Sequence, residues 1–127
     1  MRLLIVDDST LVRELLIDRL SEVRGIKIVG EAGDAPGALD MIRRLKPDAV
    51  ILDFKMPNGN GLRVLKGMRV ENLCALVVVL TNYPFSQYRD ACLKAGAHYF
   101  LDKSTEFERV TEILEHAAQT TRTPYTG

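Results

Sequence analysis

The sequence predicts an α/β fold in which five parallel strands form one sheet with helices on both of its faces. Five short apolar runs recur along the chain at nearly regular intervals. Most of them lack polar alternation, which is typical of strands buried on both faces of a parallel sheet. The stretches between the runs have helical periodicity instead, and capping or breaking residues mark their ends. Five strand–helix units of this kind predict a doubly wound sheet with right-handed crossovers.

The predicted strands are residues 3–6, 26–29, 49–52, 75–80 and 99–101. They are rich in Val, Ile and Leu, and a charged residue interrupts only the second, at Lys27. Between the strands, apolar residues recur three and four positions apart, which predicts five helices with one buried face each. These faces consist of Val12, Leu16, Leu20 and Val23; of Ala35, Ala38, Leu39, Ile42 and Leu45; of Leu62, Leu65 and Met68; of Phe85, Tyr88, Cys92 and Ala95; and of Phe107, Val110, Leu114 and Ala117.

Residues typical of helix starts agree with this division. Asp34 precedes Ala35 and Pro36 as an N-cap residue does, and proline is tolerated in the first turn of a helix. Thr105 and Glu108 have the spacing of a capping box. We therefore expect the last helix to begin at this pair.

The composition indicates a single soluble domain. The chain has 127 residues, 46% of them hydrophobic, with 17 basic and 17 acidic side chains. The zero net charge gives no broad electrostatic reason to bind nucleic acid or an anionic membrane. No apolar run approaches the ~18–20 residues of a membrane span, and Asp7 and Asp8 interrupt the N-terminal run too early for a signal peptide. We expect a cytoplasmic domain over residues 1–118 and a polar tail or linker stub over residues 119–127.

The cysteines and histidines do not form a metal-binding pattern. Cys74 and Cys92 form no CxxC pair, so we expect buried thiols in a reducing cytosol rather than a disulfide. His98 borders a strand and His116 lies on the polar side of the last helix. Both histidines are therefore expected at the surface.

Polar side chains follow four of the five predicted strands. Asp7 and Asp8 follow the first strand, and Asp53 follows the third. Thr81 follows the fourth strand, and Lys103 stands two residues beyond the fifth. The carboxyl ends of parallel strands share one edge of the sheet, and in the flavodoxin-like order 2-1-3-4-5 the first and third strands are neighbours. Three carboxylates are therefore expected to lie close together, beside a hydroxyl group and a lysine.

This group of side chains fits phosphoryl chemistry on a carboxylate. Clustered carboxylates oppose joint ionisation, and a hard divalent cation such as Mg²⁺ offsets their charge. Lys103 supplies a positive charge for Asp53 or for a phosphoryl oxygen, and Thr81 supplies a hydroxyl donor. Each residue alone has an ordinary explanation as a cap, turn or surface residue, but their joint position at the strand ends indicates a site. The sequence therefore predicts an aspartyl-phosphate site with Asp53 as nucleophile.

Four segments in order resemble the receiver domain of bacterial two-component response regulators: LLIVDDS, VILDFKMPNGNG, VVVLTN and GAHYFLDK. The resemblance spans about residues 2–118. It implies that a sensor histidine kinase or phosphotransfer protein phosphorylates Asp53. It also implies a regulatory phosphoacceptor, not an enzyme acting on other substrates. The implied output is a downstream protein or a covalently linked DNA-binding domain, without a membrane or direct nucleic acid contact.

The same resemblance implies a magnesium site. Mg²⁺ is expected to be bound directly by Asp8, by Asp53 and by the backbone carbonyl of Lys55, and through water by Asp7. Lys55 and Tyr83 occupy two variable positions of the family beside the phosphoryl site, where side chains tune the lifetime of the phosphoryl group.

The resemblance further implies a conformational switch. Thr81 and Lys103 are expected to contact the phosphoryl group, and Phe100 is expected to turn inward when Thr81 moves. The chain departs from the family at the residues that directly follow Lys103 and Thr81. Ser104 stands where the family usually has proline after a cis peptide bond, and Asn82 stands where a small residue is usual.

An aspartyl-nucleophile, Mg²⁺-dependent phosphatase of the haloacid dehalogenase type is the alternative. That class shares the metal and the lysine, but its nucleophile follows the first strand in a DxD pattern. Here Asp7 and Asp8 are adjacent at the end of the first strand. Similarity of fold is a weak argument for a shared function.

Overall fold

The computed structural model describes residues 1–120, and its main sheet has the strand order β2-β1-β3-β6-β7 with every pair parallel. These strands are β1 (Arg2–Val6), β2 (Lys27–Ala32), β3 (Ala49–Leu52), β6 (Leu76–Thr81) and β7 (Tyr99–Asp102). A small antiparallel hairpin consists of β4 (Lys55–Met56) and β5 (Gly59–Asn60). The helices are α1 (Thr10–Leu20), α2 (Ala35–Leu45), α3 (Gly61–Val70), α4 (Ser86–Lys94) and α5 (Lys103–Thr120). The predicted fold and the order 2-1-3-4-5 are confirmed.

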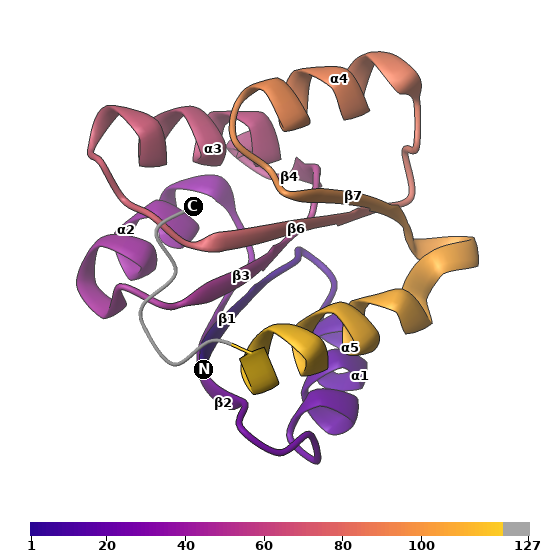
Figure 1. Ribbon diagram of the computed structural model, residues 1–127. Coiled ribbons are helices and arrows are strands. Elements are labelled where there is room, and N and C mark those ends of the chain that lie inside the picture. Colours follow the sequence, from indigo (N-terminus) through magenta and orange to yellow (C-terminus); the bar gives the residue numbers. More distant parts are fainter. Residues whose placement is uncertain (121–127) are drawn as a thin grey trace.

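The sheet lies between two layers of helices (Figure 1). One face is covered by α2, α3 and α4, and the other by α1 and α5. Successive side chains of a strand point to opposite faces, so Leu4 and Val6 belong to the first core while Leu3 and Ile5 belong to the second. Because the central strands are buried on both faces, their sequences are continuous apolar runs.

Polar side chains cap the starts of α1, α2, α3 and α5, whereas α4 follows Phe85 and has no side-chain cap. The Asp34 carboxylate accepts a hydrogen bond from the Gly37 N–H at 2.7 Å, as predicted. The prediction for the last helix is wrong, because α5 begins at Lys103. There the Asp102 carboxylate accepts from the Ser104 N–H at 2.9 Å, and the Glu106 carboxylate accepts from the Asp102 N–H at 3.1 Å. These two hydrogen bonds cap the start of α5 in place of the predicted capping box.

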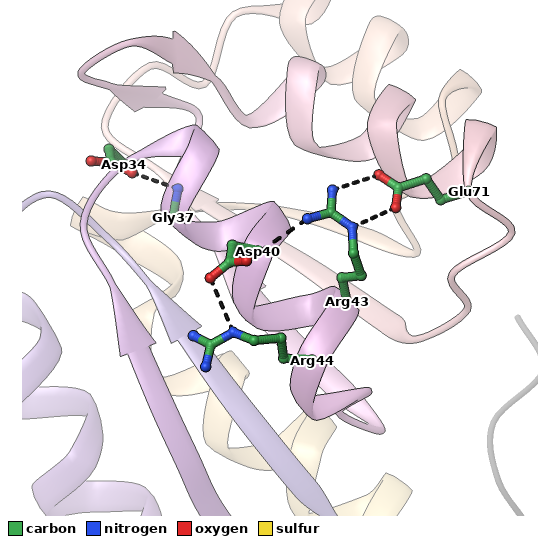
Figure 2. A network of polar contacts seen from close by, with 6 residues as sticks. All are labelled: Asp34, Gly37, Asp40, Arg43, Arg44 and Glu71. Atoms are coloured by element: carbon green, nitrogen blue, oxygen red, sulfur yellow. Dashed lines mark hydrogen bonds and ion pairs between the residues drawn. The ribbon is translucent and has the colours of Figure 1, made fainter.

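Helices α2 and α3 are joined at the surface by charged side chains (Figure 2). The guanidinium of Arg43 donates two hydrogen bonds to Glu71, at 2.7 and 2.9 Å, and Arg44 pairs with Asp40 at 3.0 Å. The contact with Arg43 lowers the pKa of the Glu71 carboxyl. Exposed pairs such as these contribute little to stability, because water screens their charges and the long side chains lose conformational freedom. They lie on the C-terminal half of α2, away from the carboxyl edge of the sheet.

Three side chains differ from their expected surroundings. Cys74 is exposed, because it lies in the connection before β6, whereas Cys92 is buried as predicted. Phe85 precedes α4 and is 54% exposed, since the helix begins one residue later and its inner face starts with Tyr88. His98 is half-buried, its Nδ1 accepts from the Val77 N–H at 3.0 Å, and burial lowers its pKa.

Two further features concern the chain ends and the backbone. Within residues 1–120 every peptide bond is trans, including the one between Lys103 and Ser104.

None of the helices described has both the length and the apolar character needed to cross a membrane. Helix α5 continues to Thr120, past the predicted boundary at residue 118, and the rest of the predicted tail, residues 121–127, lies outside the described residues.

Candidate functional site

The three carboxylates meet at the carboxyl edge of the sheet. Strands β1 and β3 are paired so that Val6 lies opposite Leu52, and Asp7 and Asp53 follow these two residues. Ligand oxygens of Asp7, Asp8 and Asp53 all lie within 4.8 Å of one another. Asp7 and Asp53 are 2% and 4% exposed, whereas Asp8 is open to solvent. The register of two parallel strands thus creates the acidic cluster that the sequence predicts.

Lys103 reaches this cluster from the end of β7. Its Nζ lies 2.6 Å from Oδ2 of Asp7 and 3.4 Å from Oδ2 of Asp53, and 9% of its side chain is exposed. The predicted contact between Lys103 and Asp53 is present, but the shorter contact is with Asp7. One lysine is therefore shared between two buried carboxylates.

Asp53 is the titratable group most affected by these surroundings. Burial raises the pKa of its carboxyl, the charges of Asp7 and Asp8 raise it further, and Lys103 lowers it, with a net pKa of about 7. The main cause is the loss of hydration, which disfavours the charged form of a carboxyl. A single ammonium group therefore does not offset the negative charge of the cluster.

The donor set fits a hard divalent cation. Both carboxylate oxygens of Asp7 already have partners, because Oδ1 accepts from the Ser9 N–H at 2.9 Å and Oδ2 contacts Lys103. Within residues 1–120, the Asp8 side chain has no hydrogen bond or ion pair. All candidate ligands are oxygen atoms, which Mg²⁺ prefers. Asp8 and Asp53 thus have oxygen atoms available for a cation, and Asp7 is held beside them.

Thr81 and Phe100 lie on the neighbouring strands β6 and β7. Thr81 is fully buried, and its hydroxyl oxygen accepts from the Tyr83 N–H at 3.0 Å, which leaves the hydroxyl hydrogen free to donate elsewhere. Phe100 is half-buried, is paired with Val79 in the sheet, and packs against the core under α2, α3 and α4. A threonine and an aromatic ring are thus positioned on adjacent strands.

The loop after Asp53 contains contacts that the sequence did not predict. Lys55 lies in the β4–β5 hairpin, and its Nζ is 5.0 Å from the centroid of the Tyr83 ring, a cation–π distance. The Gly61 N–H donates to the Phe54 carbonyl at 2.7 Å, and a Cβ at residue 61 would lie only 2.8 Å from the Asp53 carbonyl oxygen. The absence of a side chain at Gly61 thus allows α3 to begin directly behind Asp53.

Comparison with known proteins identifies relatives across almost the whole chain. The family model described as the response regulator receiver domain matches residues 3–115. A putative transcriptional regulator of Pseudomonas aeruginosa is 38% identical over 113 residues, which are 89% of this chain and 53% of that protein. A protein-glutamate methylesterase/protein-glutamine glutaminase of Myxococcus xanthus is 36% identical over 115 residues, which are 88% of this chain and 33% of that protein. The chain spans about half the length of these relatives or less.

Solved structures agree with the family match. The signal receiver domain of the putative response regulator NarL from Mycobacterium tuberculosis has a TM-score of 0.85 at 28% identity, covering 94% of this chain and 97% of that chain. A chain of the CheX-CheY-BeF3-Mg²⁺ complex from Borrelia burgdorferi has a TM-score of 0.77 at 26% identity. The match covers 90% of this chain and 89% of that chain. These relatives do not support the alternative of a haloacid dehalogenase-type phosphatase.

Proposed function

Because the chain belongs to the response regulator receiver family, we propose that it is a switch controlled by phosphorylation of Asp53. The phosphoryl donor is the phosphohistidine of a sensor histidine kinase or of a phosphotransfer protein. One observation carries the proposal above all others: Asp53 is buried beside two further carboxylates and within reach of Lys103. This arrangement has no evident structural purpose, since clustered buried carboxylates destabilise a fold unless they are compensated.

The proposed reaction is a direct displacement at phosphorus. A carboxylate oxygen of Asp53 forms the new bond to phosphorus, the bond from phosphorus to the imidazole nitrogen of the donor breaks, and that nitrogen keeps the electron pair. Lys103 and the Thr81 hydroxyl stabilise the negative charge on the transferred group. Removal of the group later requires water as the second acceptor. The chain thus promotes its own phosphorylation and dephosphorylation and is otherwise a regulatory protein.

The proposed metal is Mg²⁺, which when bound would supply positive charge to offset that of the phosphoryl oxygens. Asp8, Asp53 and the Lys55 carbonyl would hold it directly, and Asp7 would hold it through water. Both carboxylate oxygens of Asp7 already have partners, because the Ser9 N–H donates to one and Lys103 contacts the other. This supports an indirect role for Asp7, through water. The choice of Mg²⁺ as the metal is also supported by the similar complex from Borrelia burgdorferi, which contains this ion.

The proposed output is a change in the face formed by α4, β7 and α5. Thr81 shifts to bond the phosphoryl group, and Phe100 fills the space that this shift opens. A ligand or modification changes an equilibrium only through contacts that differ between the two states. The changed face then binds a downstream protein or a linked DNA-binding domain, as the similarity to a transcriptional regulator suggests. Cytoplasmic location remains a prediction.

Intact mass measurement tests the proposal. Incubation with a small phosphodonor and Mg²⁺ is expected to add one phosphoryl group to the wild-type protein and none to Asp53→Asn. Asp48→Asn is the matched control, because Asp48 precedes the same strand at its other end, where it accepts from the Arg2 N–H. Equal labelling of Asp53→Asn contradicts the assignment. The mass of the native polypeptide decides whether an output domain is covalently linked.

A further inference from the structure

Arg13 in α1 contacts the loop that carries the acidic pair. Its Nη1 donates a hydrogen bond to the backbone carbonyl of Asp7 at 2.5 Å. Its Nε pairs with Oε1 of Glu31 on β2 at 3.0 Å, and its Nη2 donates to Oγ1 of Thr10 at 3.2 Å. Only 18% of the Arg13 side chain is exposed. Each nitrogen of one guanidinium therefore has a partner, and the partners belong to three different segments.

Helix energetics alone do not explain this placement. A positive charge in the first turn lies at the unfavourable end of the helix dipole, and the first turn of α1 has no acidic residue to offset it. The guanidinium instead packs closely against the end of β2, since Nη1 lies 3.4 Å from the position of a Cβ at Gly33. The contacts with Asp7 and Glu31 hold it there.

The bond to the Asp7 carbonyl has a consequence for Asp8. The carbonyl of Asp7 and the N–H of Asp8 belong to one planar peptide unit, so a partner for the carbonyl also orients the next residue. On the other side of Asp7, the N–H donates to the Ala32 carbonyl at 3.0 Å. The Asp8 side chain itself makes no hydrogen bond or ion pair within residues 1–120. Its direction therefore depends on its backbone.

We propose that Arg13 is a positioning residue for the magnesium site. It fixes the peptide plane between Asp7 and Asp8 against Glu31 of β2, and so keeps the Asp8 carboxylate beside Asp53. The inference rests on the proposed function, because it takes the acidic cluster to be a Mg²⁺ site. Arg13 touches neither the metal nor the phosphoryl group and acts through the backbone.

The sign of the effect on Mg²⁺ affinity separates positioning from simple electrostatics. The guanidinium is a positive charge near the cluster, so through space its removal favours the binding of another cation. A positioning role has the opposite consequence, because a displaced Asp8 binds the metal less well. A role in folding alone lowers the unfolding temperature and leaves the affinity of the folded protein unchanged.

Mg²⁺ titrations of the full chain, followed by the amide chemical shifts of Asp8 and Asp53, test the proposal. Arg13→Gln is expected to raise the dissociation constant about 10-fold, the usual effect of losing a group that orients a metal ligand. Arg13→Lys is expected to raise it similarly, because an ammonium group keeps the charge but lacks the planar fork. It also serves as the second variant if Arg13→Gln folds poorly, and unfolding temperatures are recorded for both.

Arg19→Gln is the matched control. Arg19 is another arginine of α1, but it pairs with Glu108 and lies 5.0 Å from the Phe107 ring centroid, away from the acidic loop. Its variant is expected to bind Mg²⁺ as the wild type does. Unchanged or tighter binding in Arg13→Gln overturns the proposal. So does wild-type binding in Arg13→Lys, which would show that the planar fork of Arg13 is not needed to orient the Asp7–Asp8 peptide.

Asp8→Asn distinguishes failure of this inference from failure of the proposed function. If Asp8→Asn binds Mg²⁺ as well as the wild type does, the acidic cluster is not the metal site and both proposals fail. If Asp8→Asn weakens binding and both Arg13 variants do not, only the positioning role of Arg13 fails.

Discussion

The ammonium group of Lys103 lies closer to Asp7 than to Asp53, at 2.6 Å against 3.4 Å. The lysine therefore shares its charge between the residue that we propose to be phosphorylated and a neighbour that we propose to hold the metal through water. Despite this contact, the pKa of the Asp53 carboxyl is raised to about 7. Asp7 contributes to that rise in two ways, by its own charge and by engaging Lys103.

The first prediction concerns the titration of Asp53 when Asp7 loses its charge. Asp7→Asn removes one repulsive carboxylate and releases Lys103 toward Asp53, and both changes favour ionised Asp53. We expect its pKa to fall by about one unit or more. The carbon-13 shift of the Asp53 carboxyl, followed against pH in the metal-free protein, measures this. Asp48→Asn is the control, and an unchanged titration in Asp7→Asn would contradict the shared-lysine interpretation.

The second prediction concerns stability and pH in the metal-free protein. The folded pKa of Asp53 is about 7 against a reference value of 3.8, so ionising this carboxyl disfavours folding. The cost is absent below pH 3.8, grows as the pH rises toward 7, and is constant above. Asp53→Asn removes the cost. It is therefore expected to be more stable than the wild type at pH 8, by at most about 4 kcal/mol, since a shift of about three pKa units at about 1.4 kcal/mol per unit is an upper value that solvent screening reduces.

This gain is expected to shrink steadily as the pH is lowered from 7 toward 4. Urea unfolding in the presence of a chelator, at pH 4.5 and at pH 8, measures the difference between Asp53→Asn and the wild type. The same difference at both pH values would show that Asp53 titrates normally in the folded protein.

The third prediction concerns the two acidic residues after β1. Asp8→Asn should weaken Mg²⁺ binding more than Asp7→Asn, because a direct ligand contributes more to metal affinity than a residue that binds the metal through water. Both oxygens of Asp7 are already in contact with Ser9 or Lys103. We expect about a 10-fold greater loss for Asp8→Asn. Titration of each variant with Mg²⁺ at constant ionic strength measures it, and equal losses would exclude the proposed division of roles.

The fourth prediction concerns the glycine behind Asp53. Gly61→Ala places a Cβ 2.8 Å from the Asp53 carbonyl oxygen and 3.2 Å from the Phe54 Cα, so the backbone must shift. We expect a loss of about 1–3 kcal/mol in stability and slower phosphorylation of Asp53. Gly67→Ala is the control, since the atoms nearest to its Cβ belong to the flexible side chain of Leu39 rather than to the backbone. Phosphorylation at the wild-type rate in Gly61→Ala would show that the site tolerates the shift.

The fifth prediction concerns the proposed switch. Phosphorylation of the wild-type protein should change amide hydrogen exchange in α4, β7 and α5. Thr81→Ala should still accept the phosphoryl group on Asp53 but should lose this change, because no hydroxyl group draws the end of β6 toward the site. Hydrogen-exchange mass spectrometry of both proteins measures it. Changes confined to α1 and α2 would contradict the proposed output face.

The sequence alone determined the elements and the edge of the sheet at which the polar residues gather. Apolar runs without alternation are a local consequence of burial on both faces, and helical periodicity is equally local. Because parallel strands end at a common edge, the sequence placed Asp7, Asp53 and Lys103 at one edge of the sheet, and the flavodoxin-like strand order then brought them together. The N-cap at Asp34 was also visible, since a cap needs only the residues beside it.

Tertiary structure decided which groups actually touch. Whether Lys103 lies nearer to Asp7 or to Asp53 depends on differences of less than an ångström between the ends of β1, β3 and β7. The contact of Arg13 with the Asp7 carbonyl and the close approach of Gly61 to Asp53 also join segments whose spacing no local pattern encodes. Side-chain contacts of this kind arise only when separate elements pack together, and packing depends on the shape of the whole core. For that reason the sequence predicted where the site lies, and the fold set its internal geometry.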